Sequence, residues 1–295
     1  MSLGVRFSRL PRGLSHRLLP ALRYTNLMRA VEMHHLARWT HQVQGWRVLD
    51  VGCGHGLYSL SFPQRDAYLL GCDLLPADLH TADEISQGMG LDGRADFVAA
   101  DAARLPVPEG AFDLVVCNCV LEHVVDDQSA LAGMYRALKP GGLLYLSVDN
   151  AKHDLVLGFS ERLSPRAKSL LLKTEVASAP TVRQGLDDYL ARTYSVQRRY
   201  RGEDLEATLR RLGFEIVDRR GYFASLGAAH YEAFHLCRGI DPQRGLGRLA
   251  YMLTSLILYP FVLLADNPQD QEGYGLILAA RKTHSEPAPS KAGGS

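Results

Sequence analysis

Three aspartates each accompany a short apolar segment of the kind that forms a buried strand. Asp50 lies inside the first segment, and Asp73 and Asp101 directly follow the next two. Carboxylates accept hydrogen bonds from hydroxyl and amino groups, and they attract cations. The three residues therefore suit a ligand that carries both hydroxyl groups and positive charge.

A glycine-rich loop follows Asp50 in the stretch VLDVGCGHGLYSL. Glycine has no Cβ, so it adopts positive φ angles and lets a ligand lie against the backbone. We expect the loop to bind a small ligand and to lead into a helix that begins near Leu57. An ordinary strand-to-helix turn is the alternative, although such a turn needs one glycine rather than three. The loop residues predicted to bind are Gly52, Cys53, Gly54 and Gly56.

The glycine spacing distinguishes between two nucleotide-type ligands. A dinucleotide site has the pattern GxGxxG, whereas this loop has GxGxG. Asp50 stands two residues before Gly52, where its charge would repel a pyrophosphate but would suit a ligand with an amino group and a sulfonium. The stretch resembles motif I of class I S-adenosylmethionine-dependent methyltransferases.

This resemblance implies an adenosine site at the ends of the second and third strands. Asp73, which lies 21 residues after Gly52, matches the acid that accepts hydrogen bonds from ribose, with Leu74 beside it. A helix cap before the next helix is the alternative role for Asp73. Asp101 and Ala102 match the acid-small pair that sits beneath adenine.

The resemblance also implies where the methyl group is transferred. Asn118 ends the fourth strand, at the sheet edge where open parallel sheets bind their ligands. The sequence KPGG at residues 139–142 is similar to the branch of the family that contains ubiquinone-pathway and glycan-pathway enzymes. The implied cofactor is S-adenosylmethionine, and the implied acceptor is a small-molecule or lipid-linked, anionic compound methylated on a hydroxyl.

The elements that would position these residues form one α/β domain. The resemblance implies a Rossmann-like, seven-stranded sheet of order 3-2-1-4-5-7-6 with helices on both faces and a helical cap insertion. The methyltransferase domain is predicted over residues 45–281, after a basic helical arm at 1–44 and before a disordered tail at 282–295. Two insertions are expected within it, at residues 150–201 and 225–268.

A general base is needed if a hydroxyl attacks the sulfonium methyl group. His123 is the first candidate, because a neutral imidazole is available near pH 7 and this residue follows the fourth strand. A packing role is the alternative for His123. Asp149 and His153, just past the fifth strand, are the other two candidates.

Two basic segments flank or interrupt this domain. Residues 1–31 contain six arginines and no acid, which is typical of a helix at an anionic membrane surface or of a transit peptide. Residues 150–201 are rich in arginine and tyrosine, which would suit an acceptor bearing phosphate or carboxylate. In both segments a solvated helix surface is the alternative.

Residues 249–265, LAYMLTSLILYPFVLLA, contain no charge. A helix of this length is marginal for spanning a bilayer, and both flanking strands belong to one sheet. We therefore expect a re-entrant hairpin broken at Pro260, or a helix in the membrane interface, with contact through residues 246–265. Packing on the soluble core, or on a second copy in a homodimer, is the alternative.

The composition disfavours two other classes of function, nucleic-acid methylation and metal binding. The net charge of +1 over 295 residues, with no NPPY-type tetrad after the fourth strand, disfavours nucleic-acid methylation. Five cysteines without paired metal-ligand spacing favour a reducing, cytoplasmic location and no metal, while the basic N-terminal segment and the charge-free segment favour membrane contact. Two rivals remain, namely a dehydrogenase and a non-catalytic subunit or membrane-associated scaffold that binds S-adenosylmethionine or its product.

Overall fold

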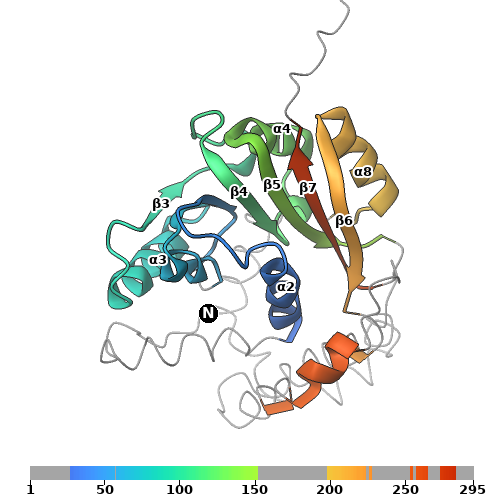
Figure 1. Ribbon diagram of the computed structural model, residues 1–295, viewed down its shortest axis with the longest axis horizontal. Helices are drawn as coiled ribbons and strands as arrows, with labels where there is room; N and C mark the ends of the chain where they lie inside the picture. The colour runs from blue at the N-terminus through green and yellow to red at the C-terminus, as the bar shows by residue number, and fades with distance from the viewer. Residues whose placement is uncertain are drawn as a thin grey trace, which may run out of the picture.

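The computed structural model describes seven parts of the chain, which are residues 27–56, 58–151, 198–223, 226–227, 253–254, 257–264 and 273–283. Most of these residues form one sheet with helices packed on its two faces (Figure 1). The expected His153, the interior of the 150–201 insertion, most of the basic arm and the tail beyond Thr283 lie outside the described residues.

The sheet has seven strands in the order β3-β2-β1-β4-β5-β7-β6, which confirms the predicted topology. The first five strands pair in parallel, and β7 runs antiparallel to both β5 and β6. Figure 1 shows β7 between them. The strands are β1 (Arg47–Val51), β2 (Tyr68–Asp73), β3 (Ala95–Ala99), β4 (Phe112–Asn118), β5 (Leu138–Asp149), β6 (Phe214–Tyr222) and β7 (Gly275–Lys282).

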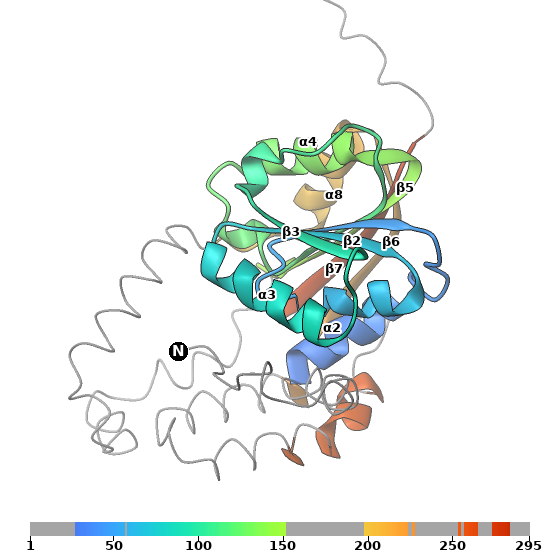
Figure 2. The same ribbon diagram turned by 90° about the vertical axis from the view of Figure 1, so that its left-hand side faces the viewer.

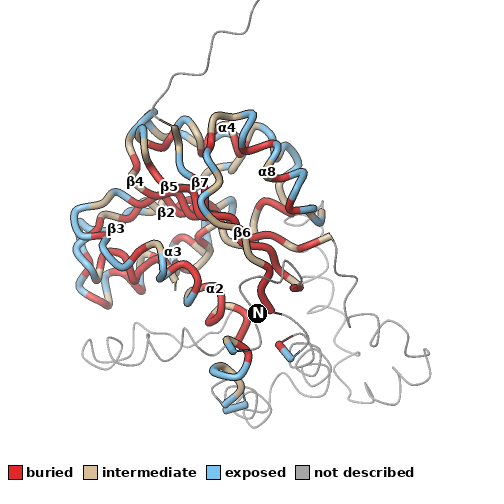
Figure 3. Tube along the Cα trace, turned by 45° about the vertical axis from the view of Figure 1, so that its right-hand side comes forward, coloured by how far each residue is buried: buried red, intermediate tan, exposed pale blue. Residues whose placement is uncertain are grey.

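The central strands are buried on both faces because helices cover each side. Within β1, Val48 belongs to one apolar cluster and Leu49 to the other. Strands covered on both sides read as continuous apolar runs rather than as alternating patterns. Figure 3 shows the resulting concentration of buried residues along β5 and β7.

Helices in the described parts of the chain cover both faces of the sheet. Figure 2 shows α2 and α3 on one side and α4 and α8 on the other. The helices are α2 (Leu27–Ala37), α3 (Pro76–Gly88), α4 (Asp127–Ala137) and α8 (Gly202–Arg211). Their ends follow local chemistry: the Asp126 carboxylate accepts from the backbone N of Ser129 at the start of α4, and Gly213, with φ of +99°, follows α8.

The prediction of an α-helix directly after the glycine loop is wrong. In its place are two 3₁₀ turns, Ser59–Ser61 and Pro63–Arg65. Pro63 has no backbone N–H to continue an α-helical ladder, so the chain starts a new turn there. Asp66 then adopts a left-handed conformation with φ of +61°, which ends the second turn and directs the chain into β2.

Two further features differ from the expected ones, namely the start of the tail and the break at Pro260. The tail does not start at residue 282, because Lys282 belongs to β7 and donates hydrogen bonds to the carbonyl oxygens of Tyr135 and Leu138. Residues 257–264 are helical through Pro260, so the expected break there is absent from this described segment.

The two described ends of the 150–201 insertion meet at the carboxyl end of β5. Asn150 forms a bridge with Tyr200, and the backbone N of Ala151 donates to the Tyr200 carbonyl at 2.9 Å. Arg198 donates from its guanidinium to the carbonyls of Val124 and Val125. The insertion therefore leaves and returns beside the turn that follows β4.

Candidate functional site

The glycine loop is fixed to the end of β2 by hydrogen bonds. The backbone N atoms of Gly52 and Cys53 donate to the Cys72 carbonyl at 2.7 and 3.0 Å. The Asp73 carboxylate accepts from the backbone N of Gly54 at 2.8 Å and from that of Leu75 at 3.0 Å. Asp73 therefore holds the loop and the turn before α3 together, as a charged acceptor of two backbone donors.

Two glycines of the loop are required for different reasons. A Cβ on Gly52, which has φ of +75°, would lie 2.2 Å from a methyl carbon of Val120. A Cβ on Gly54, which has φ of +51°, would have no heavy atom within 4 Å. Gly52 therefore permits close packing inside the protein, whereas Gly54 turns its bare backbone towards open space.

That open space is part of a cavity of about 250 Å³ between α2, the glycine loop and β4. Pockets that enclose a whole drug-sized ligand usually start at about 300 Å³. The cavity thus matches one end of a ligand the size of S-adenosylmethionine. Its wall consists of Arg29, Glu32, Met33, Leu36, Asp50, Gly52, Cys53, Gly54, His55, Tyr58, Ser59, Phe62, Val116, Asn118 and Tyr145.

Of the predicted cofactor-binding residues, five lie in this wall: Asp50, Gly52, Cys53, Gly54 and Asn118. The other five lie beyond it, along the ends of the glycine loop, β2 and β3: Gly56, Asp73, Leu74, Asp101 and Ala102. This division of the ten residues reflects the order of the strands. The cavity lies at β1 and β4, and β2 and then β3 lie on the far side of β1 from β4. An extended ligand would run from the cavity across the ends of these strands.

Asp50 is a buried carboxyl at the base of the cavity, only 5% exposed. The Ser59 hydroxyl donates to it. Burial raises the pKa of Asp50 to about 7, and the nearby charge of Asp73 adds to this increase. The group therefore titrates near neutral pH, where a cationic ligand would favour its ionised form.

Asp101 caps the short 3₁₀ turn Ala102–Arg104 (η4) after β3. One carboxylate oxygen accepts from the backbone N of Ala103 at 2.9 Å. Leu74, at the end of β2, is 55% exposed. Asp73 and Asp101 thus end two paired strands, and an exposed apolar side chain lies next to Asp73.

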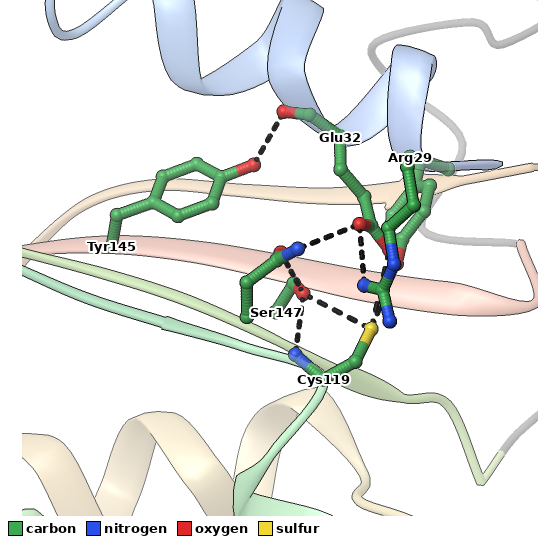
Figure 4. Close-up of polar contacts among 7 residues, drawn as sticks. Arg29, Glu32, Cys119, Tyr145 and Ser147 are labelled. Carbon is green, nitrogen blue, oxygen red and sulfur yellow. Dashed lines mark hydrogen bonds and ion pairs between the residues drawn. The ribbon is translucent and has the colours of Figure 1, made fainter. Parts of the chain in front are cut away.

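A buried polar cluster closes the cavity on the side of α2 and was not predicted from the sequence. At its centre Glu32, 1% exposed, accepts from the guanidinium of Arg29 and the amide of Asn118, each at 2.7 Å. The Cys119 thiol and the Tyr222 hydroxyl donate to its other oxygen. Figure 4 shows Arg29 and Glu32 reaching from α2 towards Cys119 and Ser147 on the sheet.

The sequence offered only a weak signal for this cluster. Arg29 and Glu32 stand three residues apart on a helix, which is an ordinary spacing for a surface ion pair. Nothing local indicated that Glu32 would contact residues 86 and 190 positions away. The sequence placed Arg29 in a basic arm that was expected to be a membrane-surface helix, a transit peptide or a solvated helix. In the structure its side chain is 26% exposed and lines the cavity.

Two of the three predicted catalytic residues lie at the ends of β4 and β5. His123 ends the 3₁₀ turn Leu121–His123 (η5), and Asp149 ends β5. Neither lines the described cavity, and their catalytic roles remain predictions. Glu122, which directly precedes His123, is 1% exposed, and one of its oxygens has no hydrogen-bond partner among the described residues. Burial raises the pKa of Glu122 to about 8.

No three histidine, cysteine, aspartate or glutamate side chains in the described parts of the chain lie where they could hold a metal ion together. The described cysteines, Cys53, Cys72, Cys117 and Cys119, are free thiols. Burial raises the pKa of Cys72 to about 12. This thiol therefore behaves as a small apolar side chain at neutral pH.

The sheet order and the loop together define the class of protein. A parallel sheet with its seventh strand inserted antiparallel, and a glycine loop after β1, is the Rossmann-like fold of class I methyltransferases. The family described as methyltransferase domain matches residues 49–146. These residues form a class I, S-adenosylmethionine-dependent methyltransferase domain.

The curated relatives match the same region. A ubiquinone biosynthesis O-methyltransferase of Pseudomonas entomophila (strain L48) is 40% identical over 106 residues, which are 36% of this chain and 45% of that protein. Its counterpart in Pseudomonas aeruginosa (strain LESB58) is 38% identical over 108 residues, with the same two shares. The chain thus spans about half the length of the curated relatives it matches.

Solved structures extend the likeness in fold beyond this region. Phosphoethanolamine N-methyltransferase 2 of Haemonchus contortus, in complex with S-adenosyl-L-methionine, is 20% identical with a TM-score of 0.55, covering 86% of this chain and 52% of that one. The 4+2 cyclase SpnF is 23% identical with a TM-score of 0.54, covering 86% and 80%. Because a cyclase shares the fold, the fold alone does not determine the reaction.

Proposed function

We propose that this protein transfers a methyl group from S-adenosylmethionine to a small-molecule acceptor. The observation that carries the proposal is the cavity at the ends of β1 and β4. There a buried carboxyl, a guanidinium and the bare backbone of Gly54 face one space. These three groups suit an amino acid end with one positive and one negative charge, which S-adenosylmethionine has and a dinucleotide lacks.

Each end of the cofactor would meet a matching group. Asp50 would accept from the α-amino group, and Arg29 would bind the carboxylate. Asp73 would accept from the ribose hydroxyls, and Asp101 with Ala102 would bind the adenine. The order of these residues along the strand ends supports the assignment, because it matches the order of the parts of the cofactor.

The reaction would be an in-line attack by the acceptor on the sulfonium methyl group. The sulfonium supplies a good leaving group, so the protein chiefly has to align the two reactants. A hydroxyl acceptor, which the name of the Pseudomonas relatives favours, must also lose its proton. His123, Asp149 and His153 are the proposed bases, and buried Glu122 beside His123 is a further group that could hold a proton near neutral pH.

The test is calorimetric titration of the protein with S-adenosylmethionine and, separately, with NADH. We expect micromolar binding of S-adenosylmethionine alone, followed by transfer of labelled methyl to phenolic or lipid-linked phenolic acceptors. Binding of NADH alone would favour the dehydrogenase rival. Binding of S-adenosylmethionine without transfer to any acceptor of the panel would favour the non-catalytic subunit and contradict the proposed activity.

The binding should depend on pH through Asp50. A pKa of about 7 means that the ionised fraction of Asp50 rises about tenfold between about pH 6 and pH 8. Since the cationic amino group needs the ionised form, affinity for S-adenosylmethionine should rise by about the same factor over this interval. Titration at several pH values measures the slope.

Two controls isolate the contribution of Asp50. The slope should vanish in Asp50→Asn, which cannot ionise. It should also be absent for 5′-methylthioadenosine, which lacks the amino group. An unchanged slope in Asp50→Asn would contradict the assignment of Asp50.

A second proposal concerns the charge-free segment, which we propose contacts a phospholipid surface. Four large apolar side chains recur at helical spacing and are exposed, by 51 to 82%: Leu253, Ile257, Phe261 and Leu264. The opposite side packs on the core through Val262, and the ring of Tyr259 contacts that of His34 on α2. Among the described helices, none combines the length and apolar composition needed to cross a bilayer.

We call these four side chains the exposed stripe. The arrangement would suit an acceptor with a lipid tail, because the helical segment that carries most of the stripe contacts α2, the helix that covers the cavity, through Tyr259. Liposome flotation tests it, with Phe261→Ser and Leu264→Ser compared with Val125→Ser, another exposed apolar side chain, 65% exposed, on the turn before α4. We expect the wild type and the Val125→Ser control to float with the liposomes, and the two stripe variants to stay unbound at the bottom of the gradient. Failure of the wild type to float, with a dimer in solution that the stripe variants disrupt, would assign the stripe to a second copy instead.

A further inference from the structure

Glu32 is the most densely coordinated carboxylate near the cavity. One oxygen accepts from Arg29 and Asn118, and the other accepts from Cys119 and Tyr222. The Tyr145 hydroxyl also donates to the Glu32 backbone carbonyl at 3.0 Å. These donors come from α2 itself and from β4, β5 and β6, so a single residue fastens α2 over three strand ends (Figure 4).

A buried carboxylate is costly unless charge and hydrogen bonds compensate for lost hydration. Here the guanidinium of Arg29 supplies the charge and the other donors fill the remaining acceptor sites. Asn118 is also held at its other end, because the Ser147 hydroxyl donates to its amide oxygen. These interlocking hydrogen bonds restrain Arg29, Glu32 and Asn118 together.

Three of these donors, Arg29, Asn118 and Tyr145, also belong to the cavity wall, and so does Glu32 itself. By accepting from Arg29, Glu32 holds a cation at one side of the cavity. By accepting from Asn118, it holds an amide at the end of β4. A flexible arginine would lose side-chain entropy on binding a carboxylate, whereas a preorganised one loses less.

We propose that Glu32 is a positioning residue that holds Arg29 in place for the carboxylate of the cofactor's amino acid end. The inference rests on the proposed function and adds to it a residue that would not touch the reacting atoms. Its consequence is selective: Glu32 should matter for ligands that carry the amino acid moiety and not for those that lack it.

The test compares S-adenosylmethionine with 5′-methylthioadenosine, which lacks the amino acid moiety, in calorimetric titrations of Glu32→Gln. Glutamine keeps the size of the side chain, and its amide nitrogen can face the Tyr222 hydroxyl, which can accept a hydrogen bond. We expect affinity for S-adenosylmethionine to fall about tenfold, which is the usual size of one lost charge-assisted hydrogen bond. Affinity for 5′-methylthioadenosine should change less than about twofold.

Two further variants separate positioning from general loosening. In an Arg29→Lys background, Glu32→Gln should have little additional effect on S-adenosylmethionine binding, because the positioned group is already gone. Glu206→Gln is the matched control, because Glu206 on α8 accepts from Arg210 and Arg219 at 2.7 and 2.8 Å on the opposite face of the sheet. It should leave the affinity ratio of the two ligands unchanged.

The outcomes distinguish this inference from the proposed function. Absence of S-adenosylmethionine binding in the wild type would overturn both. Normal wild-type binding, with Glu32→Gln weakening both ligands equally or adding its full effect to Arg29→Lys, would overturn the positioning role alone.

Discussion

Replacing Gly54 with alanine should abolish S-adenosylmethionine binding while the protein stays folded. The new Cβ would meet no protein atom within 4 Å, so it clashes with nothing in the free protein. It would instead occupy the side of the cavity where the ligand must lie against the backbone. We expect affinity to fall by about 100-fold or more, since even a small misfit of a bound group costs several kcal/mol.

The cost of the backbone conformation itself is separable. Gly54 has φ of +51°, and placing alanine there costs about 1–2 kcal/mol of stability. Gly110→Ala is the matched control, because Gly110 has φ of +62°, has equally open surroundings and lies in the turn before β4. Thermal unfolding should show similar losses in the two variants, while titration should show lost binding in Gly54→Ala alone.

A third glycine variant should lose stability because its new Cβ clashes inside the protein. Gly52→Ala places a Cβ 2.2 Å from Val120 and should therefore lower the melting temperature well below that of either other variant.

If Gly54→Ala bound S-adenosylmethionine within about threefold of the wild type, the cavity would not be the cofactor site.

Replacing Asp73 with alanine should weaken S-adenosylmethionine binding by about 100-fold or more. The carboxylate accepts from the backbone N atoms of Gly54 and Leu75, and hydrogen bonds to a charged group each contribute about 1.5–3 kcal/mol. Its loss would release the glycine loop and would also remove the proposed ribose acceptor. Titration with unfolding curves measured in parallel checks both effects.

Two comparisons define what Asp73 does. Asp96→Ala on β3 removes an exposed carboxylate that accepts from the Tyr68 hydroxyl, and it should change affinity less than about twofold. If Asp73 binds ribose, its replacement should cost less for a 2′,3′-dideoxy analogue than for the natural ligand. An equal cost for both ligands would assign Asp73 to holding the loop alone.

The positions of the strands were predictable because they depend on local patterns, whereas the order of the strands in the sheet was predicted from the resemblance to class I methyltransferases. Apolar runs bounded by glycine and aspartate marked the strands, and each connection was long enough for one helix. Asp50 within β1, Asp73 at the end of β2 and Asp101 two residues after β3 were placed near the strand ends for the same reason. The helix expected near Leu57 is replaced by 3₁₀ turns because Pro63 lies close enough to interrupt it, which is a local property of the sequence.

The amino acid sequence by itself located the strands, the glycine loop and the acids beside it, because each depends on residues close together in the chain, and the resemblance of these motifs to a known family implied the fold. Only the tertiary structure decided that Arg29 and Glu32 belong to the cavity, since Glu32 meets Asn118 and Tyr222 across 86 and 190 residues. Likewise, exposure of one side of the charge-free helix depended on how it packs against the core. Burial and long-range hydrogen bonding are properties of the assembled molecule, and no local pattern of residue types contains them.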